Sequence, residues 1–80
     1  MSERLQLKGL LSEARRKARE KQAEIEGLVI LLRNILNPYE SDVAKLNVDS
    51  AHANMTRLHA LVHEMRDLKA KIATYEQDLE

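Results

Sequence analysis

Apolar residues recur at alternating spacings of three and four along two long stretches of the chain. The first set is Leu7, Leu11, Ala14, Ala18, Ile25, Leu28, Leu32 and Ile35, with Lys21 where an apolar residue would continue the pattern. The second set is Leu58, Leu61, Met65, Leu68, Ile72, Tyr75 and Leu79. Such heptad spacing is typical of helices that pack side by side. Because the only proline, Pro38, separates the two stretches, the pattern predicts an all-α fold, an antiparallel, coiled-coil-like helical hairpin.

The residues next to the stripes predict where the first helix ends. Ser2 is a suitable N-cap for a helix that runs to about residue 36. The residue before a proline disfavours helical geometry, so this helix should stop near Asn37. Asn37, Pro38 and Glu40 then have the spacing of a second helix start, with Asn as N-cap, Pro at the first position and Glu at the third.

A short connector helix is therefore expected within residues 37–48, with Tyr39, Val43 and Leu46 on one face. Residues 47–50 contain weak helix formers that are good caps, so a further break is expected there. The second long helix should then span about residues 49–79. The alternative is one continuous helix from Pro38 to the end of the chain.

The composition is that of one small domain, residues 1–80, whose core must be aliphatic. Phe, Trp and Cys are absent, which excludes disulfides and thiolate chemistry. No apolar run approaches the roughly 20 residues needed to span a bilayer, and residues 1–11 lack the core of a signal peptide. We therefore expect a soluble, cytoplasmic chain that does not contact a membrane.

Charge is balanced in total but uneven along the chain. The formal net charge is zero, yet residues 1–21 hold seven Lys or Arg and three Glu, whereas Glu76, Asp78 and Glu80 make the C-terminal end acidic. The two ends would meet if the chain folds back on itself. The charge pattern thus also favours an antiparallel hairpin.

The segment Leu28–Leu32 is apolar on every side of a helix, and such a segment is usually buried on more than one side. One hairpin would leave much of it exposed, whereas two hairpins packed together form a four-helix bundle. We therefore expect a homo-oligomer, most simply a dimer. The residues expected to carry self-association are Leu28, Val29, Ile30, Leu31, Leu32, Ile35, Leu58, Leu61, Met65 and Leu68.

Three histidines form the group that most resembles a metal-binding site. His52, His59 and His63 fall near one stripe of the second helix, and His59 and His63 are four residues apart, a spacing that can chelate a metal. The stripe positions seven residues before and after His63 are Thr56 and Ala70, which supply no carboxylate. We therefore interpret the stripe as a solvated or interfacial polar face and expect no metal site.

A second cluster is basic and consists of Arg15, Arg16, Lys17, Arg19 and Lys21. In a dimer it could contact phosphates. Its members spread around the helix, and acidic residues four positions away partly neutralise them. No aromatic residue or Gly-rich loop accompanies the cluster, so an exposed helix end facing the acidic C-terminus is the preferred interpretation.

No residue group has the spacing of a catalytic site, and no cofactor is implied. The sequence therefore predicts a non-enzymatic module for protein–protein interaction: a small oligomeric adaptor, assembly subunit or chaperone-like regulator with an unidentified protein partner. The alternative is a nucleic-acid-associated regulator that uses residues 15–21 of a dimer.

Overall fold

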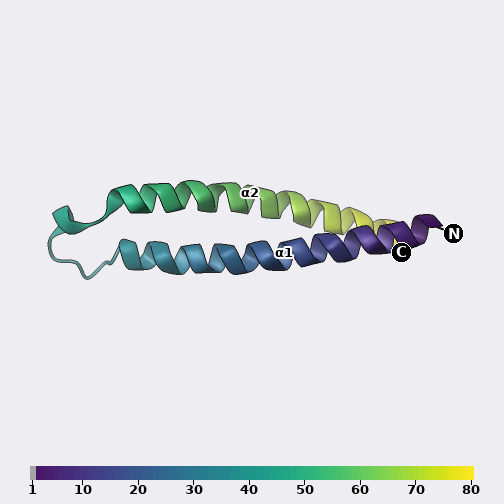
Figure 1. Ribbon diagram of the computed structural model, residues 1–80, viewed down its shortest axis with the longest axis horizontal. Coiled ribbons are helices and arrows are strands. Elements are labelled where there is room, and N and C mark those ends of the chain that lie inside the picture. The colour runs from purple at the N-terminus through teal and green to yellow at the C-terminus, as the bar shows by residue number, and fades with distance from the viewer. Residues whose placement is uncertain (1) are drawn as a thin grey trace.

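The computed structural model describes residues 2–80 as two long α-helices lying side by side (Figure 1). Helix α1 spans Ser2–Ile35 and helix α2 spans Val48–Leu79. The connector between them contains one short 3-10 helix, η1, at Val43–Lys45. The helices run in opposite directions, and the molecule measures 64 × 15 × 15 Å. Within residues 2–80 there is no strand, so the all-α helical hairpin predicted from the heptad pattern is confirmed.

The predicted stripes form the seam between the helices. In α1 the residues that are buried or half-buried are all stripe positions: Leu7, Leu11, Ala14, Ala18, Lys21, Ile25, Leu28, Leu32 and Ile35. In α2 the same spacing gives a seam of Ala51, Asn54, Leu58, Leu61, Met65, Leu68, Ile72, Tyr75 and Leu79. The seam of α2 thus extends further toward the connector than the apolar pattern indicated, through Ala51 and the polar residue Asn54.

The basic and acidic ends of the chain do meet. An Arg15 guanidinium nitrogen lies 3.3 Å from a carboxylate oxygen of Glu76. Near the chain ends, Arg4 Nη2 donates a hydrogen bond of 3.0 Å to the backbone carbonyl of Leu79. Exposed contacts of this kind add little stability each, but they favour the antiparallel arrangement.

The predicted helix start at Pro38 is wrong. The side chain of Asn37 accepts a hydrogen bond from the backbone N–H of Tyr39 (3.0 Å). The backbone carbonyl of Asn37 accepts one from the backbone N–H of Glu40 (3.2 Å), which closes a turn. Tyr39 and Val43 are 91% and 75% exposed. A short helix is marginal unless one face packs on a core, and here no core lies beneath the connector. The only helical turn is η1, so Tyr39, Val43 and Leu46 do not share a buried face.

Helix α2 starts one residue before the expected position. Asn47 is its N-cap, and the Asn47 side chain accepts a hydrogen bond of 3.1 Å from the backbone N–H of Ser50. The break expected at residues 47–50 is therefore present, and the alternative of one helix from Pro38 onward is wrong.

Two glycines lie inside α1 with no visible structural reason. Gly9 and Gly27 are exposed, and a Cβ added at either position would meet no atom within 4 Å. We expect Gly27→Ala to raise the free energy of unfolding by about 1 kcal/mol, because alanine is the better helix former. Ala23→Gly, in the same helix, should lower it by a similar amount in urea titrations. If Gly27→Ala instead destabilised the fold, another chain would have to pack closely against this glycine.

Candidate interaction surface at the loop end

Two cross-helix ion pairs identify the two sides of the hairpin. Arg15 of α1 contacts Glu76 of α2, as described above, and Arg57 Nε of α2 lies 2.9 Å from a carboxylate oxygen of Glu24. Residues seven apart on a packed helix follow the same side. Each pair therefore marks one row of residues on each helix, and the two pairs flank the seam on opposite sides.

The side marked by Glu24 and Arg57, the ion-paired side, is charged along the middle of the hairpin. Next to this pair, Lys21 Nζ lies 2.6 Å from Glu64 Oε2. The Lys21 side chain is 27% exposed, so its stem lies along the seam while its ammonium reaches the edge. The hydrogen bond from Lys21 lowers the pKa of Glu64, and the hydrogen bond to Glu24 raises the pKa of Arg57.

The other side changes character toward the connector. Steps of seven residues from Arg15 lead through Gln22 to Val29 and Leu36. Steps of seven back from Glu76 lead through Lys69 and half-buried Val62 to two more apolar residues. We call the four exposed apolar members of these rows the apolar strip: Val29, Leu36, Val48 and Met55. Their exposed fractions are 40%, 48%, 59% and 51%. The strip therefore places apolar surface from both helices on one side of the loop half.

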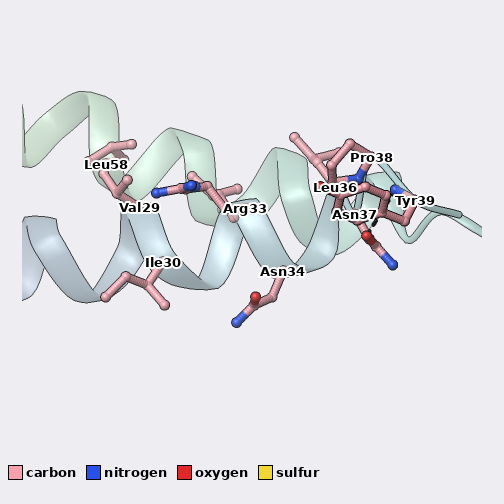
Figure 2. A pocket seen from close by; sticks show the side chains of 10 residues that line it. Val29, Ile30, Arg33, Asn34, Leu36, Asn37, Pro38, Tyr39 and Leu58 are labelled. Atoms are coloured by element: carbon pink, nitrogen blue, oxygen red, sulfur yellow. Dashed lines mark hydrogen bonds between the residues drawn. The ribbon is translucent and has the colours of Figure 1, made fainter.

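An open groove of about 860 Å³ runs beside the strip at the loop end. Val29, Leu36 and the seam residue Leu58 are among its lining residues, together with Pro38 and Tyr39 of the connector. Figure 2 shows the Val29 side chain beside Leu58, and Leu36 next to the connector. The groove thus joins the strip to the exposed connector.

A smaller hollow of about 240 Å³ lies further along α2 and is lined by His52, Met55, Thr56 and His59. The hollow adjoins the apolar strip at Met55, where His52, Thr56 and His59 form a polar edge. Two of the three histidines singled out from the sequence therefore border the strip.

The structure divides the residues that the sequence predicted for self-association into two groups. Seven lie in the seam within one hairpin: Leu28, Leu32, Ile35, Leu58, Leu61, Met65 and Leu68. The other three, Val29, Ile30 and Leu31, are exposed by 40%, 60% and 43%. These three project in three directions from α1, and in Figure 2 Ile30 points away from α2.

Sequence reasoning missed three members of the apolar strip as interface candidates. Leu36 and Val48 lie at helix ends, and Met55 flanks the stripe. They could have been found from their spacing in steps of seven residues from Val29 and Val62. That spacing indicates a shared surface only once the two rows are known to lie on the same side of the hairpin.

The histidines are exposed, and only two of them face each other. His59 Nε2 and His63 Nε2 lie 3.2 Å apart, with ring centroids 4.5 Å apart in an edge-to-face arrangement. Among residues 2–80, no group of three or more His, Cys, Asp or Glu side chains is placed to hold a metal ion. The pair offers two nitrogen donors at one exposed point of α2.

The basic cluster is partly engaged in ion pairs. Arg15 contacts Glu76 and Lys21 contacts Glu64 across the hairpin. Arg16 contacts both Glu13 and Glu20 within α1. Lys17 and Arg19 form no ion pair within residues 2–80. The structure thus disperses this charge instead of gathering it on one face.

No protein-family model, curated protein or solved structure matches this chain. Neither of the described long helices combines the length and the apolar character needed to cross a bilayer. The molecule is, by its fold, an antiparallel helical hairpin with exposed apolar residues in its loop half.

Proposed function

We propose that this chain is a non-enzymatic protein-interaction module: a self-associating helical hairpin that serves as an adaptor, assembly subunit or chaperone-like regulator. The observation that carries the proposal is the gathering of exposed apolar side chains in the loop half. Those at least 40% exposed there are Val29, Ile30, Leu31, Leu36, Tyr39, Val43, Val48 and Met55. Exposed apolar side chains concentrated in one region of a small protein are characteristic of interaction sites.

The thinness of the core supports association with a further chain. Among residues 2–80, the buried apolar side chains are Leu11, Ala14, Leu32, Ala51 and Leu61, and of these Leu61 alone is fully buried. Two helices bury one another along a single seam, and small domains with little core are marginal when alone. A dimer that forms a four-helix bundle would bury more of the same side chains.

The loop end also offers an anchor to a protein partner. Tyr39 is 91% exposed beside the groove at Val29 and Leu36, and aromatic side chains of this kind often dominate binding energy at interfaces. We propose that the unidentified partner contacts the connector at Tyr39, outside the surface used for self-association.

The alternative function, a nucleic-acid-associated regulator, has weaker support. Three of the five cations in the basic cluster are held by carboxylates, as described above, and the exposed apolar surface lies at the other end of the hairpin. Binding to DNA or RNA that falls steeply with salt concentration would favour this alternative.

Sedimentation equilibrium of the full chain at micromolar concentration tests the proposal. We expect a mass of twice the chain mass of 9.2 kDa, with full helical circular dichroism. A helical chain that sediments as a monomer at that concentration would contradict self-association.

A further inference from the structure

We infer that the occupant of the apolar strip, Val29, Leu36, Val48 and Met55, is the same strip of a second copy of this chain. The inference rests on the proposed function and makes it more specific, because it assigns self-association to one side of the hairpin. The two copies would be related by a two-fold axis, which lets a single patch serve both subunits.

Charge selects this side over the other. The ion-paired side presents Glu24, Arg57, Lys21 and Glu64, with cross-helix contacts of 2.9 and 2.6 Å. Burying these groups would cost their hydration, which the pairs recover poorly. The four side chains of the strip carry no charge. The charged residues of the same side are Arg33 at the groove and, further from the loop, Lys69 and the Arg15–Glu76 pair, so the strips themselves can meet without burying an ion pair.

The extent of the strip also suits a second hairpin. Along α2 it covers Val48 to Met55 and continues to half-buried Val62, a distance of about 21 Å at 1.5 Å per residue, roughly a third of the molecule's 64 Å length. Both helices contribute to it, so a second hairpin could contact both at once. Within one hairpin the seam buries a single side chain fully, that of Leu61. A second copy of the chain could cover more apolar surface, and it is present wherever the chain is made.

Ile30 provides a contrast within the same helical turn. It is 60% exposed, more than Val29 at 40%. It lies two residues from the seam positions Leu28 and Leu32, and therefore on the opposite side of α1. In Figure 2 the Val29 side chain is beside Leu58, while Ile30 points outward. Ile30 lines the outer edge of the groove, so a second copy seated on the strip, on the side of Leu58, would leave most of the Ile30 side chain exposed.

The experiment compares Val29→Asp with Ile30→Asp by sedimentation equilibrium over a range of concentrations. We expect Val29→Asp to raise the dimer dissociation constant at least about 100-fold, because a carboxylate would be buried without a partner. Ile30→Asp should change it by less than about threefold, since surface substitutions have small effects. Circular dichroism checks that both variants remain helical.

A second measurement does not depend on a disruptive variant. The chain has no cysteine, so Met55→Cys and Ala23→Cys each introduce one reactive thiol at an exposed position. At concentrations where the dimer forms, alkylation of Met55→Cys should be at least about fivefold slower than after dilution to monomer, since the thiol must be accessible to react. The rate for Ala23→Cys, on the outer side of α1, should not change.

The outcomes separate the inference from the function on which it rests. If Ile30→Asp dissociates the dimer as strongly as Val29→Asp, or if Met55→Cys reacts equally fast in both states, another surface joins the copies and the inference is wrong. Self-association would still hold in those cases. A wild-type chain that remains a folded monomer would overturn both.

Discussion

Leu61→Ala is expected to lower the free energy of unfolding by about 3 kcal/mol, a large share of what a domain of this size has. Leu61 is 0% exposed and is the one fully buried large side chain of the described chain. It lies in the middle of α2. A cavity there cannot be removed by fraying of a helix end. The loss therefore combines the transfer of the removed atoms to water with a cavity that collapses only in part.

Leu10→Ala is the matched control, since it removes the same atoms from a position that is 51% exposed. We expect a change of less than about 0.5 kcal/mol. Urea titrations at one fixed protein concentration measure both, because the stability of an associating chain depends on concentration. Similar losses for the two variants would mean that Leu10 is as deeply buried in solution as Leu61, and so that a further chain covers the terminal half.

The heptad pattern predicted the seam of α1 residue by residue, and that of α2 from Leu58 onward, because two packed helices leave little freedom. Once the spacing of three and four is established from Leu7 to Ile35, the face of α1 that meets another helix is determined. The break capped by Asn47 was equally predictable, because the hydrogen bond between the Asn47 side chain and the backbone N–H three residues later is a local interaction. Local chemistry and helical periodicity were sufficient for both.

The connector could not be predicted from local chemistry. Asn37, Pro38 and Glu40 have the spacing of a capped helix start, but Glu40 Oε1 accepts a hydrogen bond from the backbone N–H of Asp42 (3.0 Å), and Asp42 then caps η1 by accepting one from Ala44 (3.1 Å). A helix there would have needed a core to pack on. Whether one exists depends on how the two long helices lie, which no short stretch of sequence specifies.

The apolar strip depends on the register between the helices for the same reason. Val29 and Met55 lie on different helices, and each alone is an exposed apolar residue of a common kind. The contact between Arg15 and Glu76 at 3.3 Å shows that their rows share a side. The apolar segment Leu28–Leu32 was recognisable from the sequence. Which side of that segment forms a surface together with apolar residues of α2 was not.

Two polar residues, Lys21 and Asn54, occupy seam positions where apolar residues would give a more stable hairpin. Lys21 occupies a stripe position and reaches Glu64 at the edge, with Nζ 2.6 Å from Oε2. Asn54 is half-buried, and its side-chain amide donates a hydrogen bond of 2.8 Å to the carbonyl of Ser50. Polar residues at such positions cost stability but disfavour shifted registers and unwanted oligomers.

The double variant Lys21→Leu with Asn54→Leu should therefore raise the free energy of unfolding by about 2 kcal/mol and the thermal midpoint by roughly 10 °C. Neither change leaves a buried polar group unpaired, because Glu64 is 48% exposed and the Ser50 carbonyl retains its helix hydrogen bond. Lys17→Leu, at an exposed position of α1, is the control and should change stability by less than about 0.5 kcal/mol.

The same double variant should be less specific in its assembly. Native mass spectrometry should show a broader distribution of oligomers than the wild-type chain, because a uniformly apolar seam pairs in more than one register. A variant that is more stable and still forms a single species would show that the connector and the cross-helix ion pairs alone hold the register. A variant that is less stable than wild type would show that the seam at Lys21 and Asn54 has no room for leucine, so that overpacking exceeds the gain from burial.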